Sequence, residues 1–93
     1  MIRILDTLGI DMTNEKIQAE LDNDLRRMDM LKHDGAPEGT NSYRLVVTPS
    51  DVTYSPFLHR FRFELQYGKM INGEFTPLGE PRKYQTEGLP MLQ

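Results

Sequence analysis

The sequence predicts a two-layer α+β fold, in which one main α-helix packs on a three-stranded antiparallel β-meander. Apolar residues recur with a helical period of about 3.6 before residue 35 and with a period of about 2 after residue 42. An Asn-Gly pair at positions 72 and 73 marks a tight turn between two extended segments. Because the chain has 93 residues, we expect a single domain spanning residues 1–93.

The composition excludes several classes of protein. With 38% hydrophobic and 27% charged residues, the chain has the composition of a globular domain rather than of a disordered one. It contains no cysteine, which excludes disulfides, thiolate metal sites and cysteine nucleophiles. Its net charge of −3 lacks the positive excess that is typical of nucleic-acid-binding domains. No apolar run approaches the roughly 18 residues of a membrane span, and no secretory signal is visible, so we expect a cytoplasmic protein without membrane contact.

Within the N-terminal segment, residues 1–12, the first ten residues fit two local structures. Residues 2–7 alternate between two faces, as they would in a short strand. Ile4, Leu5 and Leu8 also lie at helical spacing, and a glycine follows them where a helix would end. We expect a short helical turn, with the strand as the alternative.

A clear amphipathic helix is predicted over residues 13–33. Thr13 is a suitable N-cap, and Gly35 follows the last turn as a natural stop. One face of this helix carries apolar residues at steps of four, four, three and three, namely Ile17, Leu21, Leu25, Met28 and Leu31.

Asp24 is an unusual residue on this helix. At about 100° per residue, it lies near the centre of the apolar stripe. A buried carboxylate without a partner is costly, so Asp24 either meets a cation, accepts hydrogen bonds or lies where the helix leaves the core. The functional interpretation is a polar contact in an interface with a partner.

An antiparallel sheet is predicted over residues 43–86, after a linker of glycine, proline and polar residues at 34–42. Residues 58–67 alternate almost without exception, as in a strand with one buried face. Residues 87–93 are expected to form a tail. The predicted buried face carries Phe61, Phe63, Leu65 and Tyr67.

The Asn-Gly turn predicts the pairing beyond it. A two-residue turn without a bulge places residue i opposite residue 145 − i. Met70 then faces Phe75 near the hairpin tip, and Lys83 faces Arg62. Exposed Met70 and Phe75 on a protruding hairpin would suit contact with a protein.

The sheet face that points away from the helix, here called the outer sheet face, is predicted to carry a basic stripe. Its members are Arg44, Arg60, Arg62 and Lys83. Such a stripe on an acidic protein favours an anionic partner, either an acidic protein or a phosphate backbone. The alternative is an ordinary solvated face balanced by Glu64.

Motifs for catalysis, metals or cofactors are missing from the sequence. It has no phosphate-binding glycine loop, no dinucleotide fingerprint, no HExxH and no nucleophile elbow. His33 is explained as a cation at a helix end, and His59 as a structural or exposed residue. We therefore expect no catalytic residues, no metal site and no cofactor.

The function expected from these features is non-catalytic binding of another protein, as an adaptor or inhibitor, with a homodimer as a plausible state. A short, acidic, cysteine-free and motif-poor chain is typical of small accessory proteins of bacteria and their phages. One alternative is nucleic-acid binding through Arg60 and Arg62. A helix-turn-helix interpretation is disfavoured, because residues 13–34 hold six acids and four bases. A small enzyme is the remaining alternative, and it would need a pocket that the sequence does not reveal.

Overall fold

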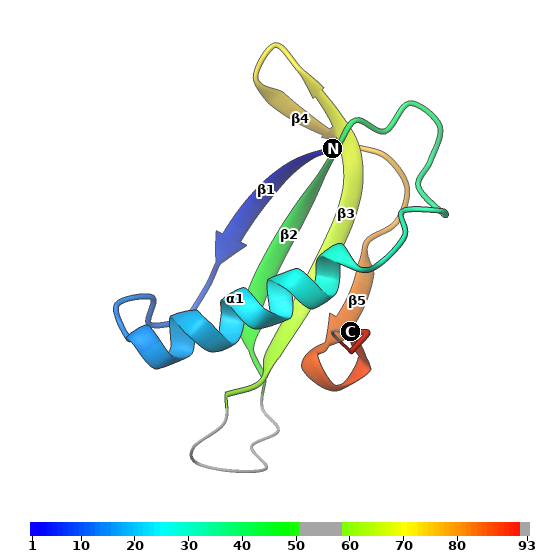
Figure 1. Ribbon diagram of the computed structural model, residues 1–93. Helices are drawn as coiled ribbons and strands as arrows, with labels where there is room; N and C mark the ends of the chain where they lie inside the picture. The colour runs from blue at the N-terminus through cyan, green and yellow to red at the C-terminus, as the bar shows by residue number, and fades with distance from the viewer. Residues whose placement is uncertain (51–58, 92–93) are drawn as a thin grey trace.

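The described part of the chain forms a five-stranded mixed sheet with one α-helix across it (Figure 1). The computed structural model describes residues 1–50 and 59–91. The α+β class predicted from the sequence is confirmed, but the predicted three-stranded antiparallel meander is wrong. The elements in chain order are β1 (Ile2–Thr7), α1 (Glu15–Asp29), β2 (Ser42–Pro49), β3 (Phe61–Ile71), β4 (Glu74–Pro77), β5 (Arg82–Gln85) and a 3-10 helical turn, η1 (Thr86–Gly88).

The strand order is β1-β2-β3-β4, and β5 also pairs with β3. β1 runs parallel to β2, whereas β2, β4 and β5 run antiparallel to β3. β3 has 11 residues, so the two four-residue strands fit one after the other along the same edge of it. β4 pairs with residues 68–71 and β5 with residues 62–65 of β3. β1 therefore forms the opposite rim of the sheet (Figure 1).

The helical turn expected within residues 1–12 is wrong, and the alternative strand is found. β1 pairs with β2 over its full length, from Ile2 opposite Ser42 to Thr7 opposite Val47. Parallel neighbours need a long crossover connection, and α1 provides it. Strands in parallel pairs carry apolar residues on both faces, which explains why β1 also shows a helix-like apolar spacing.

α1 is shorter at both ends than the predicted range 13–33. Its N-cap is Asn14 rather than Thr13, because the Asn14 side chain accepts hydrogen bonds from the backbone N–H groups of Lys16 and Ile17. The Thr13 backbone N–H and hydroxyl instead donate to the Asp11 carboxylate.

The hairpin at residues 71–74 follows the prediction. Asn72 and Gly73 have φ values of 52° and 81°, the left-handed conformation that a two-residue hairpin turn requires. Met70 lies opposite Phe75, as expected. Gly68 is a further special position, because a side chain there would collide with the Phe75 ring and with the Thr76 carbonyl oxygen. The Phe75 ring therefore packs over the bare backbone of β3.

Beyond the hairpin, the predicted register is wrong by two residues. Lys83 lies opposite Glu64 instead of Arg62. The chain leaves the ladder after Pro77 and turns at Gly79, where φ is 75°, before it pairs again as β5. A shift of two residues keeps a side chain on the same face of the sheet, so Lys83 still lies on the outer sheet face.

The core lies between α1 and the inner face of the sheet. The predicted orientation of residues 61–67 is confirmed, because all four apolar side chains of that range are buried. Leu89, in the predicted tail, is also buried against this core. Residues 92–93 of that tail and residues 51–58 of the predicted sheet region lie outside the described residues. The buried apolar residues are Leu21, Leu25, Met28, Tyr43, Leu45, Val47, Phe61, Phe63, Leu65, Tyr67 and Leu89.

Candidate functional site

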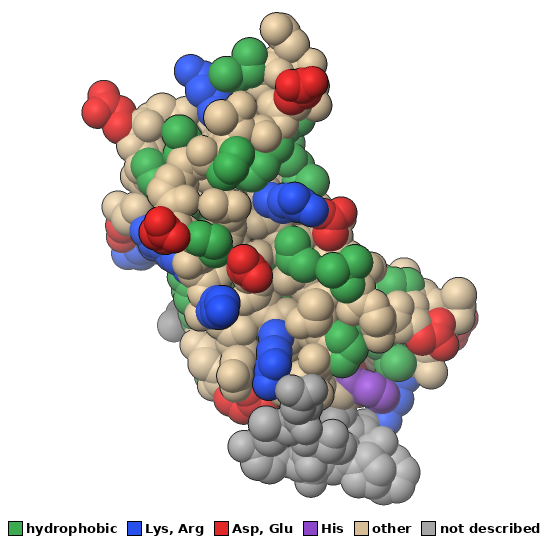
Figure 2. Space-filling view, turned by 180° about the vertical axis from the view of Figure 1, so that it is seen from behind, with side chains coloured by type: hydrophobic (Ala, Val, Ile, Leu, Met, Phe, Trp, Pro, Cys, Tyr) green, Lys and Arg blue, Asp and Glu red, His purple; other side chains and the backbone are tan. Residues whose placement is uncertain are grey.

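Among the described residues, no helix or strand covers the outer sheet face. Figure 2 shows the molecule from behind, where hydrophobic, basic and acidic side chains alternate across the surface. The strand registers and the alternation of side chains define this face. Its residues are Ile2, Ile4 and Asp6 on β1, Arg44, Val46 and Thr48 on β2, Arg62, Glu64 and Gln66 on β3, and Lys83 and Gln85 on β5.

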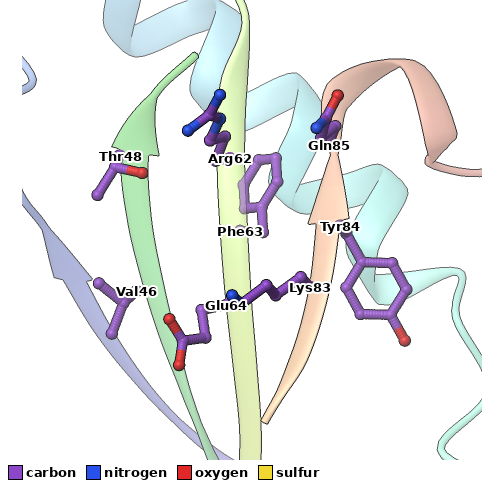
Figure 3. A pocket seen from close by; sticks show the side chains of 8 residues that line it. All are labelled: Val46, Thr48, Arg62, Phe63, Glu64, Lys83, Tyr84 and Gln85. Atoms are coloured by element: carbon purple, nitrogen blue, oxygen red, sulfur yellow. The ribbon is translucent and has the colours of Figure 1, made fainter. Parts of the chain in front are cut away.

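A hollow of about 420 Å³ lies on the outer sheet face between β2, β3 and β5. Its lining includes Thr48, Arg62, Glu64 and Lys83. Figure 3 shows the Lys83 side chain extending across β3 toward Glu64. Charges of both signs therefore meet in this hollow, which weakens its attraction for an anion.

Arg44 lies on the outer sheet face, as predicted, but an acid from β1 accompanies it. Arg44 donates from Nε to Asp6 Oδ2 at 2.9 Å, and its Nη2 lies 2.8 Å from the same oxygen. This pair was not predicted, because a short helical turn rather than a strand was expected within residues 1–10. The predicted basic stripe is thus partly neutralised by its own strand neighbour.

Arg60 does not share the outer sheet face with Arg62, and its predicted position in the stripe is wrong. It precedes β3 and lines a second hollow of about 430 Å³ beside α1. Its Nε lies 3.6 Å from Glu87 Oε1, in η1. The strict alternation of β3 holds only from Phe61 onward, where the backbone N–H donates to the Thr86 hydroxyl at 2.9 Å.

Met70 and Phe75 are half-buried rather than fully exposed. Phe75 covers Gly68, as described above, and the Met70 backbone N–H donates to the Asn41 side chain at 2.8 Å. The two residues lie opposite each other on the hairpin, beyond the charged part of the sheet. Only part of each side chain is exposed for contact with a partner, because both residues also stabilise the hairpin.

Asp24 is engaged inside the protein. The residue is 4% exposed, and its Oδ2 accepts a hydrogen bond from the Thr86 hydroxyl at 2.8 Å. Its Oδ1 lies 3.2 Å from Arg27 Nη1. Burial raises the pKa of the Asp24 carboxyl above its ordinary value, although the Thr86 hydroxyl and the Arg27 guanidinium oppose the shift. Because these contacts are internal, we do not include Asp24 in the proposed binding surface.

Arg27 is a buried cation that the sequence did not reveal. Its Nη2 donates to the carbonyl oxygens of Thr86 and Leu89, and its Nε donates to that of Pro90, each at 2.9 Å. Arg27 therefore ties the C-terminal segment to α1. Backbone carbonyls leave no side-chain pattern in a sequence, so only the spacing of three residues from Asp24 could have pointed to this role.

Both histidines have structural partners. His33 Nδ1 lies 2.8 Å from the Tyr67 hydroxyl. Glu20 Oε2 accepts from the backbone N–H of His59 at 2.8 Å and lies 2.9 Å from its Nδ1. Within residues 1–50 and 59–91, no group of three or more histidine and carboxylate side chains is arranged to hold a metal ion.

Comparison of the chain with protein-family models, with curated proteins and with solved structures gives no match. In the part of the chain that the structure describes, no helix has both the length and the apolar character needed to cross a bilayer. The function proposed below therefore rests on the residues of the outer sheet face.

Proposed function

We propose that this chain is a non-catalytic protein-binding module, acting as an adaptor or inhibitor, that holds its partner on the outer sheet face. The observation that carries the proposal is the apolar character of this face along the parallel pair β1 and β2. Ile2 is 55% exposed, and Ile4 and Val46 are half-buried on the same face. Parallel strands are usually covered on both faces, so a partner would supply the second cover.

The residues around this apolar strip indicate the chemistry of the partner. The register places Arg44 beside Ile4 and Asp6 beside Val46, so the Arg44–Asp6 ion pair lies among these apolar side chains. Glu64 and Lys83 follow in line with Val46 on the next two strands. Apolar side chains beside paired charges of both signs suit a protein surface that offers matching apolar and polar groups. We therefore expect a protein partner with a small apolar patch and a mixed polar rim.

Nucleic acid is less well supported as a partner. Arg44 is already paired with Asp6, and Lys83 lies opposite Glu64. Arg60 is separated from them by its position beside α1. The net charge of −3 would also oppose a phosphate backbone.

Val46→Lys tests this proposal. The register places Val46 between Asp6 and Glu64 on the outer sheet face, so a lysine there would gain acidic neighbours and the fold should persist. A photoreactive side chain replacing the exposed Gln85, on the same face, should crosslink one protein in extracts, with or without nuclease. Val46→Lys should reduce that crosslink by about tenfold, which corresponds to about 1.4 kcal/mol of lost binding.

Gln18→Lys is the matched control, because it adds the same charge at an exposed position of α1. It should leave the crosslinked product unchanged. A crosslink that disappears after nuclease treatment, or one that Val46→Lys does not weaken, would contradict the proposal.

A further inference from the structure

Within residues 1–50 and 59–91, no strand pairs with the outer backbone edge of the rim strand β1. The backbone N–H groups of Ile2 and Leu8 donate toward β2, to the carbonyls of Asn41 and Val47 at 3.2 and 2.9 Å. In a parallel ladder, alternate residues direct their N–H and C=O groups to opposite sides. The backbone groups of Arg3, Leu5 and Thr7 therefore point away from β2, where no described strand lies (Figure 1).

This edge lacks the features that usually protect a rim strand. Such edges are blocked by lysine, by proline, by bulges or by unpaired charges. β1 contains neither lysine nor proline, and both of its charged side chains have partners within the protein. Arg3 Nη1 lies 3.4 Å from Asp29 Oδ1, and Asp6 pairs with Arg44. No unpaired charge of β1 would therefore be buried if a strand were added.

The apolar residues of β1 are also exposed at this rim. Leu5 is 38% exposed on the inner face, and Leu8, just beyond the strand, is 57% exposed. Another extended chain paired with this edge would form backbone hydrogen bonds with it and would also bury these apolar side chains, and both effects favour binding.

We propose that the occupant of this edge is β1 of a second copy of the chain, running antiparallel about a two-fold axis through Leu5. Leu5 then lies opposite Leu5 of the partner subunit, and Arg3 lies opposite the partner subunit's Thr7. All three outward-facing residues exchange backbone hydrogen bonds in this register, because Arg3 and Thr7 are placed symmetrically about Leu5.

The side chains support this register over its neighbours. On the outer sheet face, Ile2 lies opposite the partner subunit's Leu8, so two exposed apolar groups bury each other. A shift toward the N-terminus that centres the axis on Ile4 sets Thr7 opposite Met1, which lies outside the strand, and leaves the exposed Leu8 with no residue opposite it. A further shift places Arg3 against Arg3 of the partner subunit, which repels. On the outer sheet face the dimer covers Ile2 and leaves Arg44, Val46 and the hollow beside them open, so it does not depend on the proposed function.

Charge exchange at Leu5 tests the dimer and its register together. The wild-type chain, of 10.8 kDa, should sediment at about twice this mass at high concentration and dissociate on dilution. Leu5→Lys and Leu5→Glu should each be monomeric, because each sets like charges opposite each other on the axis. An equimolar mixture of the two variants should regain the dimer mass, since lysine then meets glutamate.

Ile71→Lys is the control, because Ile71 is an exposed apolar strand residue in the hairpin, away from β1. It should sediment as the wild type does. A wild-type protein that stays monomeric, a dimer that survives Leu5→Lys, or a mixture that stays monomeric would each overturn the proposal. If a variant fails to fold, amide exchange of the wild type decides: slow exchange at Leu5 that becomes fast on dilution supports the dimer, and fast exchange at all concentrations contradicts it.

Discussion

Arg27→Ala is expected to destabilise the protein by about 3–5 kcal/mol, because it leaves Asp24 buried without its cation. The same change removes the donors to the carbonyls of Thr86, Leu89 and Pro90. Folded domains have a free energy of unfolding of about 0.05–0.15 kcal/mol per residue, or about 5–14 kcal/mol for 93 residues. The substitution should therefore remove a large part of the total stability.

Urea unfolding followed by far-ultraviolet circular dichroism measures this loss. Arg26→Ala is the matched control, since Arg26 is the exposed neighbour of Arg27 on α1. Its effect should stay within about 0.5 kcal/mol. Equal effects of the two substitutions would show that the contacts of Arg27 with the C-terminal segment do not stabilise the fold.

Phe63→Ala is expected to lower the free energy of unfolding by a similar amount, about 3–5 kcal/mol, because it removes a buried ring and leaves a cavity. Phe63 is 1% exposed on β3, and its ring meets that of Phe61 edge to face, with the centroids 6.4 Å apart. β3 pairs with β2 on one side and with β5 on the other at this position, so the backbone has little freedom to collapse into the cavity.

The control for Phe63→Ala is Glu64→Ala, at the next position of the same strand. The Glu64 side chain is exposed on the outer sheet face, so its loss should cost no more than about 1 kcal/mol. Thermal or urea unfolding of the two variants checks the contrast. If both positions cost the same, the assignment of inner and outer faces along β3 would be wrong.

Local signals in the sequence were sufficient for the central part of the fold. The alternation along residues 61–67 predicted the buried face of β3, because strand side chains repeat every two residues. Asn72 and Gly73 predicted the hairpin and the pairing of Met70 with Phe75, because the turn residues themselves carry the required left-handed conformation.

The errors arose where distant parts of the chain decide the structure. β1 pairs with a strand about forty residues away, and no local pattern distinguishes its apolar spacing from that of a helical turn. The loop at residues 78–81 shifts the pairing of Lys83 with β3 by two positions. This shift was not predicted, because the alternation of strand residues does not show how many residues of a loop are unpaired.

These errors changed the candidate binding surface. With β1 in the sheet, Asp6 accompanies Arg44, and Ile2 and Ile4 join Val46 on the outer sheet face. The predicted basic stripe thereby becomes a surface on which apolar side chains lie between charges of both signs. Arg62 and Lys83 remain on that face, whereas Arg60 and Asp24 lie beside the second hollow instead.

Residue-resolved amide exchange of the N-terminal segment, measured in the Leu5→Lys variant, tests most directly whether this segment is a rim strand paired with β2. We expect slow exchange at Ile4, Asp6 and Leu8, whose N–H groups point to β2. Exchange should be fast at Arg3, at Thr7 and at the substituted position 5, whose N–H groups point away from β2. Slow exchange at consecutive residues, as in a helix, or fast exchange throughout the segment would contradict it.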